Sequence, residues 1–441
     1  MNKIEQRIRR SNYWVKDFLH GGYLWNNFKE VSYIMSHPKE SIIVREKYLT
    51  DILSYAAKHT NYYRKYDGFS RLGDFPIVNK SVYREHYSDF LVQEKSIPGQ
   101  QGPLHIQKTS GSTGIPFEIP QDTLCRVRRL ATIKAENELV GFQTMDTLLH
   151  LRSFSHFWGG TTDIRYEKAN NIYYADNSVL TEEKVSKIVD LINSCGIKYI
   201  RGYVTSIDLI THYLIKNNIE LVGHPLFIAG GEVLTENVRR RIVESLQCHI
   251  ISQYANEENG VFGQSRVDEC SIINLNLANC YLEVLELESE KPAAKGELGR
   301  IVVTDFTNHA FPMIRYDIGD VGMANEISDE GQVLSIVGLA GRRQDLIYRT
   351  DGKIIDLWNS MPKVLYYNPK VIQWQFVQKG RKDYSLYLSV TGDISGEISS
   401  IITGLKGVLG EDADITVRSS VSLSPVLSSG KRKVIVNEYT K

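Results

Sequence analysis

The sequence contains few cysteines, and they show no pairing pattern. Its 441 residues include five cysteines, and none of them belongs to a Cys-x-x-Cys motif. An odd number at wide spacing argues against a disulfide framework. The sequence therefore predicts reduced thiols at Cys125, Cys195, Cys248, Cys270 and Cys280.

An excess of charge and long apolar runs are also missing. Lys plus Arg and Asp plus Glu each number 52, so the whole chain has no field that would attract nucleic acid or an anionic membrane. No uninterrupted apolar run approaches the roughly 18 residues of a spanning helix. The first residues are polar and charged, unlike a signal peptide. These absences predict a cytoplasmic chain with no membrane span and no nucleic-acid partner.

The length and a hydrophobic content of 42% predict two or three domains with a sizeable core. Helical and strand patterns alternate between about residues 147 and 246, including a helix over 182–194 capped by Thr181 and a helix over 235–246. Such alternation favours an α/β fold with parallel sheet and flanking helices, in which ligands bind at the carboxyl ends of strands. Residues from about 281 to 340 have the pattern of β hairpins. A small mixed segment of strands follows, with one helix expected near 394–405.

The most informative segment is 108–114, KTSGSTG. Glycines allow a backbone to approach oxyanions closely, and the hydroxyls add hydrogen-bond donors, so the segment suits a polyphosphate. It is not the common P-loop, because no Gly-x-x-x-x-Gly-Lys-Ser/Thr motif occurs. An ordinary flexible loop has the same composition. The rest of the chain decides between these readings.

Four later segments follow this loop in a fixed order. They are Tyr254-Ala255-Asn256-Glu257-Glu258, Tyr316-Asp317-Ile318-Gly319-Asp320, Gly341-Arg342-Arg343-Gln344-Asp345 and Ser429-Gly430-Lys431. Each alone would fit a turn or a solvated surface. Together, in this order and over nearly the whole chain, they resemble the adenylate-forming superfamily of acyl-CoA synthetases, luciferases and peptide-synthetase adenylation domains.

The resemblance implies a role for each matched residue. Tyr254 would stack on adenine, Asp320 would take the ribose hydroxyls, and Glu258 would hold magnesium. Lys431 would bridge the acyl carboxylate and the α-phosphate, with Arg342 near the nucleotide, so the implied catalytic residues are Lys431, Arg342 and Glu258. The implied ATP and AMP contacts are Thr109, Ser110, Gly111, Ser112, Thr113, Gly114, Gly231, Glu232, Tyr254, Asn256, Glu257, Asp320 and Arg342.

The chemistry itself calls for these residue types. A carboxylate that attacks an α-phosphate brings two anions together and expels a third, so cations are needed between them. Lys431, Arg342 and a magnesium ion at Glu258 would supply that charge. No general base is required, because the nucleophile is already an anion.

The resemblance also implies a domain plan and a substrate pocket. It predicts a large N-terminal adenylation domain over residues 1–343, which includes the β-rich subdomain. A small mobile α+β C-terminal domain would occupy 344–441, with the hinge at Gln344. By position, the acyl pocket is expected at Phe157, Trp158, Gly159, Tyr203 and Gly230.

Further segments, including 52–63, 74–80 and 312–316, narrow the resemblance to the phenylacetate-CoA ligase-like branch, and within it to capsule and exopolysaccharide-locus members. Three positions depart from the pattern: Glu257 replaces Thr or Ser, Gln344 replaces a charged hinge residue, and 349–353 replaces a Gly-rich stretch. Some members of the branch carry zinc on Cys and His. Here no His closely follows Cys270, and no zinc is expected.

The predicted function is ATP- and Mg-dependent adenylation of a small carboxylic acid, with pyrophosphate release. The acyl group would then pass to an amine or hydroxyl acceptor, such as an amino sugar in polysaccharide biosynthesis. Two alternatives stay open. One is an acyl- or aryl-CoA ligase that uses CoA as acceptor, and the other is a non-catalytic nucleotide-binding scaffold.

Overall fold

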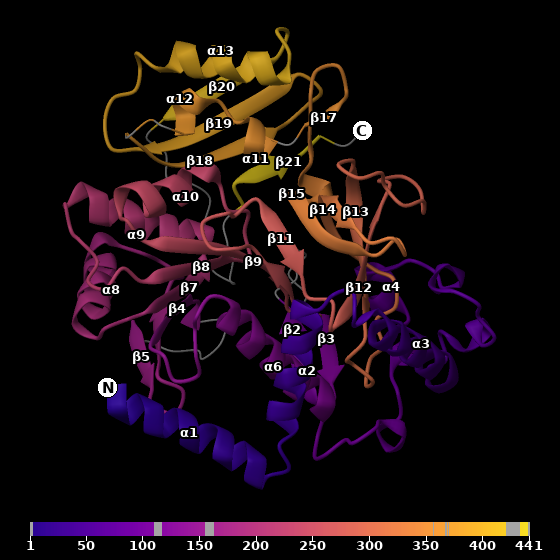
Figure 1. Cartoon of the computed structure of the whole chain (residues 1–441). Coiled ribbons are helices and arrows are strands. Elements are labelled where there is room, and N and C mark those ends of the chain that lie inside the picture. The colour runs from indigo at the N-terminus through magenta and orange to yellow at the C-terminus, as the bar shows by residue number, and fades with distance from the viewer. Residues whose placement is uncertain are drawn as a thin grey trace. The chain divides into compact units, whose positions relative to one another are not determined.

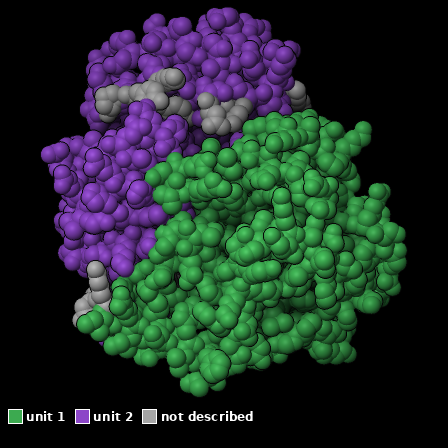
Figure 2. All heavy atoms as spheres, in the orientation of Figure 1, with its two compact units in different colours: residues 1–146, 252–337 green, residues 147–251, 338–441 purple. Residues whose placement is uncertain are grey.

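The structure is a computed structural model that describes residues 3–109, 117–154, 163–355, 357–366, 368, 370–419 and 433–439. The chain divides into two compact units, each built from two segments (Figure 2). Unit 1 comprises residues 1–146 and 252–337, and unit 2 comprises residues 147–251 and 338–441. Among the described helices, none is both long and apolar enough to cross a membrane.

Unit 1 opens with helices and continues into antiparallel strands (Figure 1). Its helices are α1 (Lys3–Leu19), α2 (Tyr23–Ser36), α3 (Ile42–His59), α4 (Lys80–Glu85), α5 (Tyr87–Phe90) and α6 (Thr123–Leu139), with short 3₁₀ turns at Arg64–Tyr66, Leu72–Asp74 and Glu94–Ser96. Its strands are β1 (Val78–Asn79), β2 (His105–Thr109), β3 (Phe117–Gln121), β9 (His249–Asn256), β10 (Gly260–Gln264), β11 (Ile272–Leu275), β12 (Cys280–Leu285), β13 (Leu298–Asp305), β14 (Tyr316–Ile327) and β15 (Val333–Arg342), of which β9 and β15 extend into the adjoining segments.

Pairing in unit 1 is almost entirely antiparallel. Strands β12, β13, β14, β15, β11, β10 and β9 are neighbours in that order in one sheet, and the pairs β12–β13, β13–β14, β15–β11, β11–β10 and β10–β9 are antiparallel. The exception is the short strand β1, which pairs parallel to β14 with Val78 opposite Tyr316. Strands β2 and β3 pair with Thr109 opposite Phe117. The predicted β-rich character of residues 281–340 is therefore confirmed.

The first segment of unit 2 has the predicted βα alternation. Strands β6, β4, β7 and β8 pair parallel in that spatial order, and β5 adds antiparallel to β6. The elements are β4 (Leu148–Arg152), β5 (Ile164–Glu167), β6 (Ile172–Asp176), α8 (Glu182–Ser194), β7 (Tyr199–Tyr203), α9 (Val204–Lys216), β8 (Leu226–Gly230) and α10 (Glu236–Arg240), followed by a π-helical turn over Arg241–Ser245.

Helix α8 shows why the sequence predicted this helix at its observed bounds. The Thr181 hydroxyl accepts a hydrogen bond from the Lys184 amide at 3.3 Å, which satisfies one of the first unpaired amides. Glu182 and Glu183 complement the positive end of the helix. One face buries Val185, Ile188, Val189 and Ile192, which is the spacing of a helix packed on a sheet.

The second segment of unit 2 has its own core. A sheet in the order β20, β19, β18, β21 packs with α13 around Phe376, Leu386, Ile401 and Leu405, each fully buried. The elements are a 3₁₀ turn (Arg343–Asp345), β16 (Ile347–Tyr348), β17 (Ile354–Ile355), α11 (Leu357–Ser360), α12 (Lys363–Tyr366), β18 (Val371–Gln378), β19 (Asp383–Val390), α13 (Ile398–Leu409), β20 (Asp414–Ser419) and β21 (Ile435–Asn437).

The predicted α/β class, with parallel and mixed sheets flanked by helices, is confirmed. The helix expected over 235–246 is α-helical only for five residues and then widens into a π-helix. The C-terminal helix begins at Ile398 rather than Ile394. The domain boundary between residues 343 and 344 stays a prediction.

Candidate active site

The two adjacent glutamates of the 254–258 segment lie at the tip of a hairpin. Asn256 of β9 pairs with Gly260 of β10, so residues 257–259 form the turn. Gly260 has φ of +87°, a left-handed conformation that favours glycine. The Asn256 side chain accepts the Asn259 amide at 2.6 Å. The hairpin thus holds Glu257 and Glu258 next to each other in a fixed turn.

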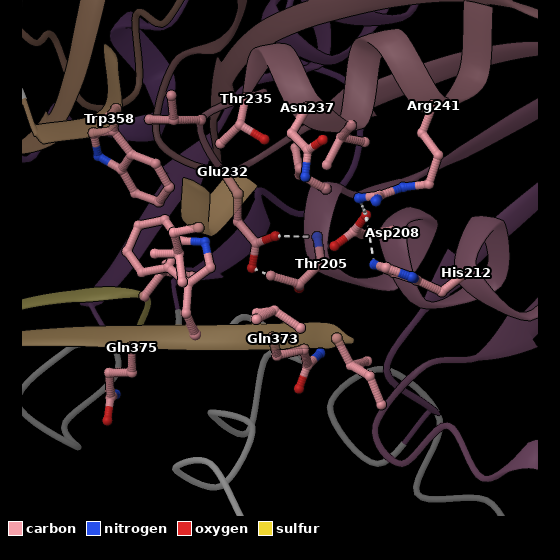
Figure 3. Close-up of a pocket in the computed structure, with 18 of the residues that line it drawn as sticks. Thr205, Asp208, His212, Glu232, Thr235, Asn237, Arg241, Trp358, Gln373 and Gln375 are labelled. Atoms are coloured by element: carbon pink, nitrogen blue, oxygen red, sulfur yellow. Dashed lines mark hydrogen bonds and ion pairs between the residues drawn. The ribbon is translucent and has the colours of Figure 1, made fainter. Parts of the chain in front are cut away.

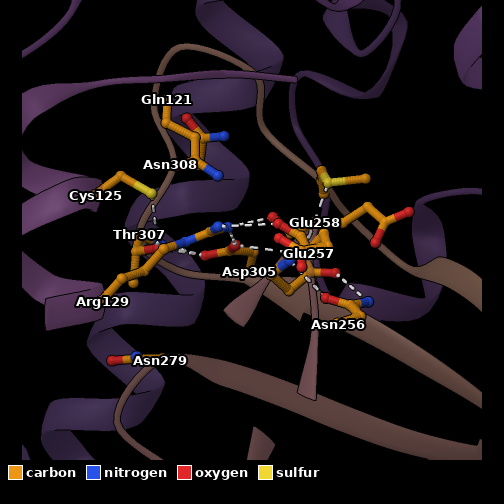
Figure 4. Close-up of polar contacts among 12 residues, drawn as sticks. Gln121, Cys125, Arg129, Asn256, Glu257, Glu258, Asn279, Asp305, Thr307 and Asn308 are labelled. Atoms are coloured by element: carbon orange, nitrogen blue, oxygen red, sulfur yellow. Dashed lines mark hydrogen bonds and ion pairs between the residues drawn. The ribbon is translucent and has the colours of Figure 1, made fainter. Parts of the chain in front are cut away.

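Arg129 of α6 reaches the backbone of this turn (Figure 4). Its guanidinium donates to the carbonyl of Glu257 at 3.3 Å and to the carbonyl of Glu258. The same group lies 3.6 Å from a carboxylate oxygen of Asp305. Because Arg129 and Asp305 are both largely buried, the backbone of the two glutamates is tied to a helix and to the end of β13. Their side chains remain available for other partners.

Lys80 connects the hairpin tip to the strand that leads into the 108–114 segment. Its ammonium donates to the Thr109 hydroxyl at 2.8 Å and lies 3.0 Å from a carboxylate oxygen of Glu258. Strand β1 precedes Lys80 and pairs with β14, and the Asn79 side chain caps the helix that Lys80 begins. These contacts bring Thr109, Glu258 and Lys80 together, although Lys80 and Glu258 are 178 residues apart in the sequence.

The two glutamates have different partners. Glu258 is 8% exposed and meets the Lys80 cation, whereas Glu257 is exposed and accepts a hydrogen bond from Gln107 at 2.7 Å. The sequence required at least one of them to meet a cation or solvent. In the structure, Glu258 meets a cation, which is Lys80, and Glu257 meets solvent.

Tyr254 and Asp320 also lie together. The Tyr254 hydroxyl donates to a carboxylate oxygen of Asp320 at 2.9 Å. Tyr254 projects from β9, and Asp320 from β14. The contact orients a carboxylate beside an aromatic ring, which is the pair of groups that a nucleoside needs for its ribose and its base.

In unit 2, the expected pocket residues Tyr203 and Gly230 are neighbours at the carboxyl ends of β7 and β8. Gly231 follows with φ of +73°. The next residue, Glu232, accepts the Thr205 amide at 2.8 Å and the Thr205 hydroxyl at 3.1 Å. Since Thr205 lies in the first turn of α9, the Glu232 carboxylate caps that helix.

Glu232 lines a cavity of about 80 Å³ in unit 2 (Figure 3). One wall comes from residues 204–241 and the other from residues 358–434, including Trp358 and Trp374. Asp208 lies in the first wall with Arg241, with which it forms an ion pair. One wall thus carries an ion pair, and the other carries two tryptophans together with Lys433.

The hinge segment of unit 2 groups charges around Asp345. Burial raises the pKa of this carboxyl, and the nearby cations Lys433 and Arg342 oppose the shift. The Lys433 ammonium lies 4.0 Å from Asp345. Gln344 sits between Arg342 and Asp345 in a 3₁₀ turn. Arg342 is therefore an exposed cation beside a partly buried carboxyl group.

Nine of the expected site residues lie outside the described part of the chain. They are Ser110, Gly111, Ser112, Thr113 and Gly114 of the loop, Phe157, Trp158 and Gly159 of the acyl pocket, and Lys431.

Sequence reasoning missed Lys80, Arg129, Gln107 and Thr205. Lys80 had a usable signal, because it ends the 74–80 segment that matched the phenylacetate-CoA ligase-like branch. The other three had none, since each acts through a contact distant in sequence. Within the described ranges, no three His, Cys, Asp or Glu side chains gather as a metal site. A magnesium ion would therefore combine Glu258 with phosphate oxygens and water, as Mg²⁺ commonly does.

Comparison with known proteins agrees with this fold. No protein-family model matches the chain. Protein CapK of Staphylococcus aureus is 27% identical over 252 residues, which cover 55% of this chain and 52% of that protein. The match thus spans about half the length of this curated relative.

Solved structures match over more of the chain. The crystal structure of 2-hydroxyisobutyryl-CoA ligase in the postadenylation state with 2-HIB-AMP has a TM-score of 0.67 at 15% identity, covering 89% of this chain and 88% of that one. Anthranilate CoA ligase AuaEII with anthranoyl-AMP has a TM-score of 0.52 at 14% identity, covering 74% and 65%. The chain has the fold of these adenylate-forming ligases.

Proposed function

We propose that this chain is an ATP-dependent ligase that activates a small carboxylic acid as an acyl adenylate. An oxygen of the acid attacks the α-phosphorus of ATP, the bond to the β-phosphate breaks, and pyrophosphate leaves. The acceptor then attacks the acyl carbon and AMP leaves. The observation that carries the proposal is the contact among Lys80, Thr109 and Glu258, on a fold that it shares with ligases solved with acyl adenylates.

Each part of that contact suits a nucleotide triphosphate. Thr109 ends the strand before the Ser/Thr/Gly loop, so a phosphate held by the loop would lie within reach of the Lys80 ammonium. A lysine is a compact charge that binds phosphate well. Glu258 would exchange part of its pairing with Lys80 for a magnesium ion bound to the same phosphates. Asp320, oriented by Tyr254, would take the ribose hydroxyls.

The acceptor has two candidates. The departure at residues 349–353 from a Gly-rich stretch supports an amine or hydroxyl acceptor, such as an amino sugar. The structural neighbours named above are CoA ligases, which supports CoA. Preformed acyl adenylate mixed with CoA in one arm and with an amino sugar in the other separates the two by which one consumes it.

Isotope exchange between pyrophosphate and ATP, run with a panel of aryl, amino and hydroxy acids, tests the proposal. Lys80→Met should lower the acid-dependent exchange rate by about 100-fold or more, because a preorganised positive charge at the phosphates is lost. Lys431→Ala should lower it by several orders of magnitude while ATP still binds. Lys47→Met is the matched control, since Lys47 forms an exposed ion pair with Asp51 in the same unit.

A folded wild-type protein that binds ATP but exchanges pyrophosphate with no acid would refute the ligase and support a nucleotide-binding scaffold. Normal exchange in Lys80→Met, with native circular dichroism, would remove Lys80 from the site.

A further inference from the structure

Helix α1 carries a row of large apolar side chains on its exposed side. Ile4, Ile8, Val15, Phe18 and Leu19 are each 55–75% exposed. Their spacing of three, four and seven residues places them on one side of the helix. We call these five residues the α1 stripe. Single exposed apolar residues are common on protein surfaces, whereas a continuous row marks an interaction site.

The opposite side of α1 is fixed to unit 1. Gln6 is buried, and its amide nitrogen donates to the carbonyl of Met145 at 2.9 Å. Arg10 donates to the carbonyl of Thr144 at 2.7 Å and lies 3.3 Å from a carboxylate oxygen of Asp146. Gln6 and Arg10 each follow a stripe residue by two positions, which is about 200° of helical rotation. The α1 stripe therefore faces away from the body of unit 1.

The C-terminal half of α1 is held by α2. Trp14 packs against Trp25 and Phe28, with ring centroids 4.9 and 5.4 Å away. The Asp17 carboxylate accepts the backbone amides of Leu24 and Trp25 at 3.2 and 2.9 Å. Both halves of α1 are thus anchored to unit 1, so the α1 stripe is presented to its surroundings as a fixed surface.

Positive charges flank the α1 stripe. Helical spacing places Arg7 on one rim of the stripe and Lys16 on the other, and both side chains are exposed. Glu5 lies on the same rim as Lys16, one turn from Arg9, so these two charges offset each other. The rims therefore carry a net positive charge, although the whole chain has equal numbers of acidic and basic residues.

We propose that α1 docks this protein on the surface of an anionic lipid membrane. The helix lies in the plane of the surface, the α1 stripe enters the boundary between head groups and acyl chains, and Arg7 and Lys16 meet lipid phosphates. A helix that lies flat needs one apolar side, whereas a spanning helix needs about 20 mostly apolar residues. Helix α1 has 17 residues, with charged and polar side chains on its other sides. Only the flat arrangement fits it.

Charge distinguishes a membrane from a second copy of the chain as the partner. Two α1 stripes packed on each other would bring the rim charges of both copies to one interface, where like charges repel. An anionic membrane meets the same charges with the opposite sign. The membrane is therefore the partner that fits both the stripe and its rims. This inference does not depend on the proposed ligase reaction.

Sedimentation with sucrose-loaded vesicles tests the proposal. The full chain is mixed with vesicles of phosphatidylcholine alone, or of phosphatidylcholine and phosphatidylglycerol in equal parts. The anionic vesicles should bind the protein about 10-fold or more tightly than the neutral vesicles do, because two rim cations face anionic head groups. Raising the salt concentration should reduce this preference, because exposed charges are screened.

Variants separate the contribution of the stripe from that of its rims. Phe18→Ser and Ile8→Ser should each lower binding to anionic vesicles by about 10-fold, because one apolar side chain fewer enters the membrane. Arg7→Gln combined with Lys16→Gln should remove most of the preference for anionic over neutral vesicles. Ile43→Ser is the matched control, since Ile43 on α3 is 75% exposed but lies outside the stripe. This control should bind as the wild type does.

Urea unfolding checks that each variant is folded, and the midpoint should not change, because the replaced side chains are exposed. Light scattering without lipid measures the oligomeric state. A wild type that binds neither kind of vesicle, or both equally, overturns the inference. A wild-type dimer that Phe18→Ser dissociates also overturns it and assigns the stripe to a second copy. A loss of binding in Ile43→Ser as large as in Phe18→Ser overturns the assignment to α1.

Discussion

Glu136 is a buried acid whose carboxylate has no hydrogen-bond partner among the described residues. It lies on α6 with 1% exposure. Burial raises the pKa of this carboxyl from 4.5 to about 8. The group is therefore protonated in the folded chain at neutral pH and ionised in the unfolded chain.

The stability of Glu136→Gln relative to the wild type should increase as the pH rises. The pKa of Glu136 is higher in the folded chain than in the unfolded chain. Its contribution to the stability of the wild type is therefore fully present below pH 4.5 and is lost between pH 4.5 and about pH 8. The loss is about 1.4 kcal/mol per pH unit across this window. Glu136→Gln removes that slope. Urea unfolding of both proteins at pH 5, 6.5 and 8 measures the difference.

The gap between the two unfolding free energies should widen from pH 5 to pH 8. A gap that stays constant over the three pH values would mean that Glu136 titrates normally. Glu138→Gln is a suitable control, because this neighbour is less buried and the cations Arg10 and Lys134 oppose its raised pKa.

At the scale of elements, one capping residue joins two distant segments. Asp122 is fully buried at the start of α6, where one oxygen accepts the Cys125 amide at 2.7 Å. Its other oxygen accepts the amides of His309 at 2.6 Å and Ala310 at 3.3 Å. The cap of the helix that carries Arg129 is therefore also the anchor of the 309–310 segment.

Asp122→Ala should destabilise the protein by about 2–4 kcal/mol, since it removes a helix cap and leaves buried amides unpaired. Thr181→Ala, which removes the cap of α8 without a second anchor, should cost only about 1 kcal/mol. Asp122→Asn should fall between them. Urea unfolding at pH 7 ranks the three variants. If Asp122→Ala costs no more than Thr181→Ala, the link to residues 309–310 contributes nothing.

Elements with complete local signals could be predicted from the sequence. Helix α8 was expected at its observed bounds, because its cap, acidic first turn and apolar face all lie within the helix. The π-helical turn after α10 could not be predicted, since the residues of 235–246 also suit an uninterrupted α-helix. Capping signals are missing at α13, where no side chain caps the helix, so its start was misplaced by four residues.

The site residues likewise fall into those that sequence motifs indicated and those that only the assembled fold brings together. Motifs indicated Glu258 and Asp320, but the partners Lys80 and Tyr254 are 178 and 66 residues away in the chain. Nothing local to Glu258 tells that a lysine will neutralise it. Pairings of this kind follow from the parallel contact of β1 with β14 and from the β9–β10 hairpin. They emerge only once the sheets are assembled.

For the whole molecule, the proposed reaction requires two chemical steps on one chain. The resemblance to adenylate-forming enzymes implies that the C-terminal domain turns about Gln344 between them. Gln344 lies in a 3₁₀ turn between Arg343 and Asp345, where the fixed φ of proline is compatible with the backbone. A proline there would restrict rotation, and it would also disfavour the helical conformation of Arg343, the first residue of the turn.

Gln344→Pro should therefore separate the two half-reactions. Pyrophosphate exchange should stay within about 3-fold of the wild type, while acceptor-dependent AMP release falls by about 10-fold or more, because the second conformation is no longer reached. Gln344→Ala, which keeps the rotation, should retain both activities. Equal losses of exchange and AMP release in the proline variant would show that residue 344 supports the first step directly. Unchanged activities would place the hinge elsewhere, and a proline scan of the flanking positions 343 and 345 would then locate it.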